Sequence, residues 1–384
     1  MFLHDGFCCP GGTFSTGYFL TEICGHGTPC PYRIRCKIAE AAIQPAVSAA
    51  ALHAFNQTFP KLIWHDIPFS DNALSLLQNH RAKQALAALL EELKPDLLHC
   101  HGTIAGIYGR SVAEKLGIPV FYTAHDFRVF HGCHGAERLV FAPLERRHSR
   151  HTQVMLTVCP EDAAYAKKCL HAAQVVDLPD VGLDCARYAT PQRSAAEVRR
   201  ELRIPEDATV LLSVGTLRMQ KRLRIVLQAM TRLRELDQLH YIICGEGPDL
   251  LFLQKLTEKL HLTERVHLLG YRTDIPDLLG AADIFCMPSR REGCGMAALE
   301  AMAAGLPLIV TRVHGTKTYA EAGESACCLK GDLVLACADA IQQLCDNKLL
   351  RKQMGAHNRA DAVRFSGEGR MMQMRELYCQ AMNQ

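Results

Sequence analysis

Two glutamates, Glu292 and Glu300, stand eight residues apart in the segment SRREGCGMAALEAMAAGLPLIVT, residues 289–311. Gly293 and Gly295 follow the first glutamate, and glycines let backbone N–H groups approach a ligand closely. The alanine-rich run after them predicts a helix whose positive N-terminal end suits a phosphate or a sugar oxygen. A carboxylate can also accept two sugar hydroxyls. The spacing therefore predicts a sugar or phosphate site, the alternative being that Glu292 only caps the helix and Glu300 is solvated.

A second group of charges follows an apolar run in SVGTLRMQKRLRIVLQAM, residues 213–230. The expected strand ends at Gly215, and a short loop carrying Arg218 and Lys221 leads into the next expected helix. Cations at the carboxyl end of a strand are well placed to hold a diphosphate. An ordinary basic loop is the alternative for a motif this short.

The first half of the chain offers two weaker candidates. His125 follows the apolar run in IPVFYTAHDF, residues 118–127, and a histidine at a strand end in a cleft can donate to a sugar hydroxyl. Gly11 and Gly12 in CPGGTFSTGYFL, residues 9–20, precede a possible helix and could form a tight loop opposite the phosphates. A structural histidine and a plain N-terminal turn are the alternatives.

The segment PLERRHSRHTQ, residues 143–153, is basic and rich in histidine. It could contact an anionic lipid or the phosphate of an acceptor. The alternative is a solvated helix face, which is the more common role of such charge runs.

Short apolar runs alternate with amphipathic stretches along most of the chain, which is typical of parallel βαβ units. A polar, proline-containing break near 186–205 separates two such series. We therefore predict an α/β protein with two Rossmann-like, doubly wound domains that face a central cleft, where ligands favour the carboxyl ends of the strands. The predicted domains are 1–188, with an atypical first ~60 residues, then 189–364, and a C-terminal helix at 365–384 that crosses back to the first domain.

The bulk composition excludes several classes of protein. The 384 residues are too many for one compact core, and a net charge of +3 is too small to indicate nucleic-acid binding. The sequence contains no run of 18 apolar residues, so we expect no membrane span. Its N-terminus lacks the pattern of a signal peptide. The 18 cysteines are scattered without the tight pairs of a zinc site, so we expect them to be reduced and mostly small core residues.

Several motifs in order resemble glycosyltransferase family 4, the retaining enzymes of the GT-B fold. The segment with Glu292 and Glu300 is similar to the family's E-x7-E signature, and SVGTLRMQK is similar to its phosphate-binding loop. CGEGPD, VHLLGYRTDIPDLLGAADIFCMPS and LPDVGLDCARY fit in order, and KPDLLHCHGTIAGIYGR and YTAHDF resemble the branch that builds capsular and exopolysaccharide repeat units. The resemblance covers roughly 62–384.

The resemblance implies a role for each matched position. Glu300 would bind the ribose hydroxyls of the nucleotide, Lys221 would bind the diphosphate, and His125 would lie by the donor sugar. Glu292 would hold the sugar together with the backbone, and Gly11 and Gly12 would lie under the diphosphate. The matched backbone positions are Gly293, Cys294, Gly295 and Met296.

Two positions depart from the family's pattern. The family's arginine after the loop glycine is Thr216 here, and Arg218 is the candidate replacement. The family's usual HGF is HDF, which puts Asp126 near the donor.

The resemblance implies a hexosyl- or N-acetylhexosaminyl-transferase that moves a sugar from a UDP- or GDP-linked donor, with retention and without a catalytic metal or other cofactor. The acceptor would be a lipid-linked or oligosaccharide glycan in cell-surface polysaccharide biosynthesis, and the protein would be cytoplasmic with a possible peripheral contact on the inner membrane. The alternatives are a nucleotide-sugar 2-epimerase-like enzyme of the same fold and an inactive sugar-nucleotide-binding partner protein.

Overall fold

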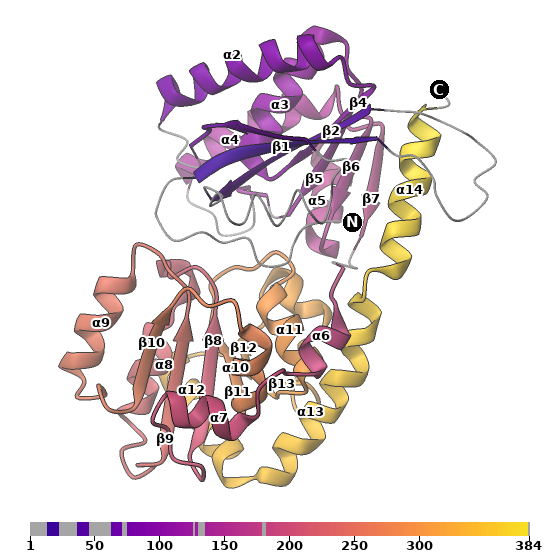
Figure 1. Ribbon diagram of the computed structural model, residues 1–384. Coiled ribbons are helices and arrows are strands. Elements are labelled where there is room, and N and C mark those ends of the chain that lie inside the picture. Colours follow the sequence, from indigo (N-terminus) through magenta and orange to yellow (C-terminus); the bar gives the residue numbers. More distant parts are fainter. Residues whose placement is uncertain are drawn as a thin grey trace. The chain divides into compact units, whose positions relative to one another are not determined.

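The computed structural model describes residues 14–22, 37–45, 63–70, 75–125, 127–129, 135–178 and 182–382 (Figure 1). The chain divides into two compact units. The first combines Met1–Pro179 with Arg370–Gln384, and the second is Asp180–Gly369.

The first unit is built on a seven-stranded sheet of order β3-β1-β2-β4-β5-β6-β7. The strands are β1 (Phe14–Glu22), β2 (Lys37–Pro45), β3 (Ile63–Ile67), β4 (Leu97–His101), β5 (Val120–Ala124), β6 (Val154–Thr157) and β7 (Gln174–Asp177). Strand β1 is antiparallel to both of its neighbours, whereas β2 and the four strands from β4 to β7 are parallel.

The helices of the first unit cover both faces of this sheet. Because successive strand residues point to opposite faces, neighbouring residues of one strand pack against different helices. Leu98 and Tyr122 belong to the core cluster that includes residues of α2 and α3, whereas Leu97 and Phe121 pack with Tyr378 of the C-terminal helix. The helices are α2 (Leu76–Leu93), α3 (Thr103–Leu116), α4 (Gly135–Ser149), α5 (Pro160–Cys169) and α14 (Glu368–Met382). Figure 1 shows α14 alongside the strands of the first unit.

The second unit has a six-stranded, fully parallel sheet of order β10-β9-β8-β11-β12-β13. The strands are β8 (Thr209–Val214), β9 (Leu239–Cys244), β10 (Val266–Gly270), β11 (Ile284–Met287), β12 (Leu308–Thr311) and β13 (Ala326–Leu329). Connections from β8 run to one side and connections from β11 run to the other. The order therefore reverses between β8 and β11, and ligands of such sheets bind beyond the carboxyl ends of the strands at that point.

Helices lie on both faces of the second sheet. They are α6 (Cys185–Ala189), α7 (Ala195–Glu201), α8 (Arg224–Met230), α9 (Leu250–Lys259), α10 (Ile275–Ala281), α11 (Met296–Ala304), α12 (Leu333–Asp346) and α13 (Lys348–Ala362), with the short turns η1 (Met219–Lys221), η2 (His314–Thr318) and η3 (Val363–Phe365). One core cluster joins α8, α9 and α12 to the sheet, while α11 contacts β11 and β12 as well as the helices α6, α10 and α13.

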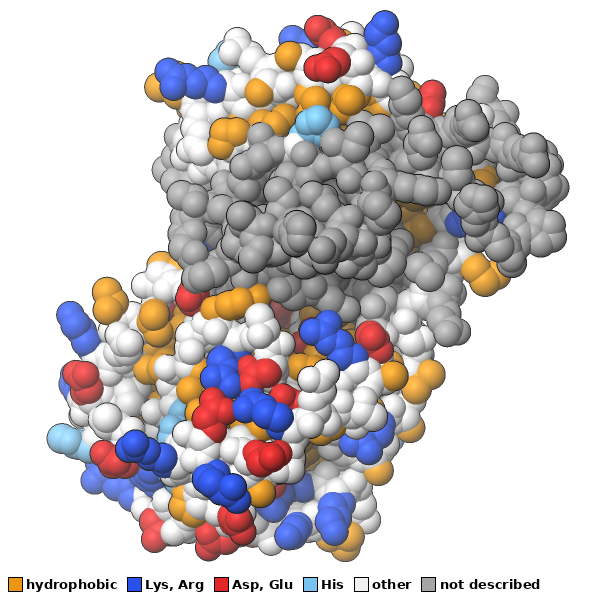
Figure 2. All heavy atoms as spheres, viewed as in Figure 1, with side chains coloured by type: hydrophobic (Ala, Val, Ile, Leu, Met, Phe, Trp, Pro, Cys, Tyr) orange, Lys and Arg blue, Asp and Glu red, His pale blue; other side chains and the backbone are white. Residues whose placement is uncertain are grey.

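Mixed charges cover the second unit over α7 and α10 (Figure 2). Arg193 contacts Glu201 at 2.6 Å and Asp277 at 3.0 Å, and Arg272 contacts Glu201 at 3.1 Å and Asp274 at 2.6 Å. Acidic and basic groups alternate in this network, so this part of the surface has no field of a single sign.

The predicted α/β class with two doubly wound domains is confirmed, and two details differ from the sequence prediction. The division falls between Pro179 and Asp180 rather than at 188, because α6 packs on α11 in the second unit. The segment CPGGTFSTGYFL does not continue into a helix after its glycines: Phe14–Glu22 forms strand β1, as its aromatic and threonine content favours.

The C-terminal helix begins at Glu368. The preceding turn η3 belongs to the second unit, where Leu183 N donates to Phe365 O at 2.8 Å. Within the described ranges, every helix is too short or too polar to cross a lipid bilayer.

Candidate functional site

Two loops meet at the point where the strand order of the second sheet reverses. One follows β8 and contains Gly215 and η1, and the other follows β11 and leads to α11. Arg290 N donates to Gln220 O at 2.7 Å, which ties the two loops together through their backbones. Segments about 70 residues apart in the chain thus form one surface, as expected at a switch point of a parallel sheet.

Lys221 and Glu292 form an ion pair between these loops. Lys221 Nζ lies 2.6 Å from Glu292 Oε1, and the Ser289 hydroxyl donates to the same oxygen at 2.6 Å. The Glu292 side chain is only 10% exposed, and its Oε2 accepts no hydrogen bond within the described part of the chain. One carboxylate oxygen is therefore anchored, and the other is placed to accept a hydroxyl from a ligand.

Lys221 lies directly over Gly215. A β-carbon added to Gly215 would lie 3.7 Å from Lys221 Nζ, an ordinary van der Waals distance, so the lysine side chain packs against this glycine. The sequence prediction placed both residues at an anion site, and the structure brings them together with Glu292.

The loop after β9 supports this arrangement. Gly215 N donates to Cys244 O at 3.0 Å, and Leu217 N donates to Glu246 O at 2.8 Å. A β-carbon on Gly245 would lie only 1.9 Å from Gly215 O, and Gly245 has a φ of 137°. Only glycine permits this contact, so the CGEGPD motif acts by fixing the backbone under Lys221.

The N-terminus of α11 points its first amides away from the helix. Gly295 adopts the left-handed conformation with φ 72°, and no side chain caps the helix. Ala298 N donates to Gly295 O at 2.8 Å, but the amides of Met296 and Ala297 find no acceptor among the described residues. These amides and the helix dipole are suited to an anion.

The predicted backbone positions before α11 are held by close packing. A β-carbon on Gly315 would lie 1.6 Å from Gly293 O and 3.0 Å from Cys294 Cα, so η2 presses directly on this loop. Gly293 and Cys294 therefore form part of the same frame as Glu292.

Glu300 lies on α11, where its Oε1 accepts a hydrogen bond from the Tyr188 hydroxyl at 2.9 Å. Tyr188 is buried on α6 and was not predicted as a site residue. Its segment, LPDVGLDCARY, was recognised in the sequence, but no spacing rule links α6 to α11. Only the packing of these two helices shows that Tyr188 orients the second glutamate.

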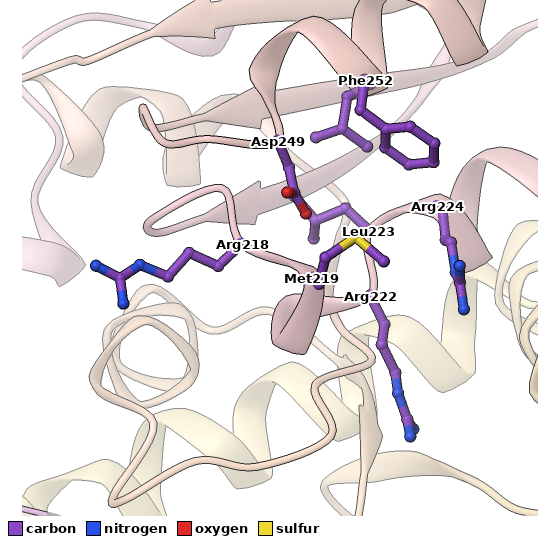
Figure 3. Close-up of a pocket in the computed structure, with 8 residues that line it drawn as sticks. Arg218, Met219, Arg222, Leu223, Arg224, Asp249 and Phe252 are labelled. Carbon is purple, nitrogen blue, oxygen red and sulfur yellow. The ribbon is translucent and has the colours of Figure 1, made fainter. Parts of the chain in front are cut away.

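Arg218 does not join the Lys221–Glu292 pair. It lines a small pocket beside η1 whose other lining residues are Met219, Arg222, Leu223, Arg224, Asp249, Phe252 and Leu253 (Figure 3). The Arg218 side chain extends to the side opposite Arg222 and Arg224. Burial lowers the pKa of Arg222, and the nearby Arg290 and Arg224 lower it further. Arg222 therefore lies near two further arginines that the sequence prediction did not include among the site residues.

His125 lies in the first unit, after β5. Its Nε2 is 3.2 Å from His101 Nδ1, and the His101 ring lies 4.2 Å from that of His99. Three histidines thus gather at the carboxyl ends of β4 and β5. The part of the chain that the structure describes holds no group of three or more His, Cys, Asp or Glu side chains suited to a metal ion. Gly11, Gly12 and Asp126 lie outside the described residues.

The basic segment 143–151 is only partly a surface feature. Arg146 and Arg147 are exposed on α4, but Glu145 is buried and forms an ion pair with Arg110 at 2.7 Å. Burial lowers the pKa of His148 to about 4, with a smaller contribution from Arg110. The segment therefore has one face in the core of the first unit and one in solvent.

Comparison with protein families gives two matches along the chain. Residues 47–179 match the family described as "Glycosyl transferase 4-like domain", and residues 194–361 match "Glycosyl transferases group 1". The two matches fall on the first and second units respectively.

Individual proteins resemble the chain over most of its length. The putative glycosyltransferase EpsD of Bacillus subtilis is 29% identical over 78% of this chain and 81% of its own length. The UDP-Gal:alpha-D-GlcNAc-diphosphoundecaprenol alpha-1,3-galactosyltransferase of Escherichia coli is 29% identical over 65% of this chain and 66% of its own. The crystal structure of HepE from Anabaena in complex with UDP-glucose superposes with a TM-score of 0.71 at 19% identity, covering 87% of this chain and 90% of that one, which establishes the shared fold.

Proposed function

Because the chain belongs to glycosyltransferase family 4 and is a glycosyltransferase of the GT-B fold, we propose that it transfers a hexosyl or N-acetylhexosaminyl group from a nucleotide sugar with retention at the anomeric carbon. The donor is UDP- or GDP-linked, and the acceptor is a lipid-linked glycan in cell-surface polysaccharide biosynthesis. The observation that carries this proposal is the Lys221–Glu292 pair beside the uncapped N-terminus of α11.

The leaving group of such a transfer is a nucleoside diphosphate, and negative charge develops on it as the glycosidic bond breaks. Lys221 and the amides of Met296 and Ala297 are the groups of the second unit that stabilise this charge. Glu292 Oε2 accepts a hydroxyl of the donor sugar, and His125 is the further residue that the family resemblance assigns to that sugar. These protein cations and amides supply the stabilisation for which other transferases use a metal ion, so the proposal includes no cofactor.

The galactosyltransferase relative supports a diphosphate-linked lipid acceptor, and the UDP-glucose complex of the Anabaena structure supports a UDP-linked donor. A lipid-linked acceptor would bring the protein to the cytoplasmic face of the membrane. The exposed Arg146 and Arg147 of α4 are then the candidates for a contact with anionic lipid.

The role of Glu300 can be tested directly. We expect Glu300→Gln to weaken nucleoside diphosphate binding by about tenfold or more, since a hydrogen bond to a charged group contributes about 1.5–3 kcal/mol. Tyr188→Phe should weaken it less, because the carboxylate remains but loses one of its orienting contacts. Isothermal titration with UDP and GDP measures both effects. Glu258→Gln on the exposed face of α9 is the control, and unchanged affinity in Glu300→Gln would exclude the ribose-binding role.

The function itself is tested by a panel of UDP-, GDP- and ADP-sugars with the purified protein. Thermal stabilisation and release of nucleoside diphosphate are followed with and without a polyprenyl-diphosphate-linked sugar. We expect stabilisation by one donor and release that increases with the acceptor. Release of a free 2-epimer of the sugar would indicate the epimerase reaction instead, and binding without any turnover would indicate an inactive binding protein.

A further inference from the structure

The side chain of Tyr319 carries a buried hydroxyl that makes no hydrogen bond with the described residues of the second unit. The residue follows η2 and is 1% exposed, and its Oη has no hydrogen-bond partner among the described residues. Buried hydroxyls are almost always hydrogen-bonded, so an unpaired one needs an explanation. A phenylalanine would fill the same space without leaving a buried polar atom unpaired.

The position of this hydroxyl connects it to the donor site. A β-carbon on Gly295 would lie 2.5 Å from Tyr319 Oη, so the phenol lies directly beneath the turn that starts α11. Met287 Cε and Thr316 Cγ2 surround the same point, at 3.1 and 3.7 Å from that β-carbon. The hydroxyl is therefore enclosed by the loop that carries Glu292 and by apolar groups.

The state of the phenol suits a permanent donor. Burial raises the pKa of Tyr319 well above its ordinary value, and the nearby Glu292 and Cys294 raise it further. The hydroxyl is therefore held in its protonated form, which can donate a hydrogen bond. The ring is held in place by an edge-on contact with Phe365, whose centroid is 6.1 Å away.

When no nucleotide sugar is bound, Glu292 is paired with Lys221 and Ser289. Its Oε1 receives both the Lys221 ammonium and the Ser289 hydroxyl, at 2.6 Å each. A diphosphate that arrives at the α11 N-terminus carries negative charge and attracts the Lys221 ammonium toward itself. That diphosphate also repels the Glu292 carboxylate, which then keeps only the Ser289 hydroxyl as a donor in place of two, so a second neutral donor is needed to replace the lysine.

We propose that Tyr319 is a positioning residue whose hydroxyl donates a hydrogen bond to the Glu292 carboxylate once the donor diphosphate draws Lys221 away. The inference rests on the proposed function, because it assigns a partner to Glu292 in the donor-bound state. On this proposal, the Tyr319 hydroxyl gains its hydrogen-bond partner only when the nucleotide sugar is bound.

The test compares Tyr319→Phe with wild type, using UDP-glucose, UDP-N-acetylglucosamine and GDP-mannose as probes. The melting temperature without a donor should be equal to or higher than that of wild type, because no hydrogen bond is lost. The kcat for nucleoside diphosphate release should fall about tenfold, which corresponds to about 1.4 kcal/mol, while KM changes less than about twofold. The double variant Glu292→Gln/Tyr319→Phe should be no slower than Glu292→Gln alone.

Tyr241→Phe is the matched control. Tyr241 is also a fully buried tyrosine of the second unit, but its hydroxyl is already paired with Ser213 at 2.7 Å. We expect this variant to lose melting temperature and to keep its kcat, which is the opposite of the pattern for Tyr319→Phe.

The outcomes are separable. A kcat of Tyr319→Phe within twofold of wild type, or a lower melting temperature that accounts for its lost activity, overturns the role of Tyr319 alone. A wild-type protein that neither binds nor turns over any of the three nucleotide sugars overturns the proposed function and this inference with it.

Discussion

Lys221→Ala is expected to lower kcat/KM for nucleoside diphosphate release by about 10²–10³-fold, the usual effect of removing one group that stabilises charge in the transition state. The variant loses the cation nearest to the expected diphosphate. It also leaves the Glu292 carboxylate, which is 10% exposed, without its ion-pair partner. Both changes raise the energy of a transition state in which the leaving group becomes more negative. Steady-state assays with the donor identified in the nucleotide-sugar panel measure the effect.

Two further variants define what Lys221 contributes. Lys221→Arg keeps the charge but replaces a compact ammonium with a planar group, so we expect an intermediate loss. Lys255→Ala removes an exposed lysine of α9 and should leave the rate unchanged. The stability of Lys221→Ala should fall by about 1–3 kcal/mol, because the largely buried Glu292 carboxylate loses the cation that balances its charge. A kcat/KM within tenfold of wild type would contradict the assigned role.

Glu145→Ala is expected to destabilise the first unit by about 3–5 kcal/mol, the range for removing one partner of a buried ion pair. Arg110 and Glu145 have side chains that are 0% and 1% exposed, and their N–O distance is 2.7 Å. Arg110 also stacks over the Tyr122 ring at 3.9 Å, and Arg110 Nε donates to Gly106 O at 2.8 Å. Removing the carboxylate strands a guanidinium in the core, which calorimetry detects as an earlier first-unit transition.

The double variant Arg110→Met/Glu145→Leu separates charge from packing. It replaces the pair with apolar side chains, and we expect it to recover most of the lost stability. Glu114→Ala is the control, because Glu114 pairs with the exposed His151 at 2.9 Å and should cost less than about 1 kcal/mol. A Glu145→Ala protein that melts with wild type would show that α4 does not depend on this ion pair.

The sequence by itself determined the fold class and the local motifs. Strands that are buried on both faces read as continuous apolar runs, such as DLLHC and IIC. Such runs can be recognised from the order of the residues alone. Glu292, Glu300 and Lys221 were singled out as candidates because each stands in a short segment whose neighbours are also informative, and their roles stay predictions. The prediction of a helix after Gly11 and Gly12 was wrong, because a short stretch with aromatic residues fits either a helix or a strand until its partner strands are known.

Only the tertiary structure decided which groups meet. The order of the second sheet places β8 beside β11, and this adjacency brings Lys221 to Glu292 although 71 residues separate them in the chain. Tyr188 reaches Glu300 because α6 packs on α11, and Tyr319 lies beneath Gly295 because η2 presses on the same loop. Each contact depends on how separate elements pack, and hydrophobic period and motif spacing carry no information about that packing.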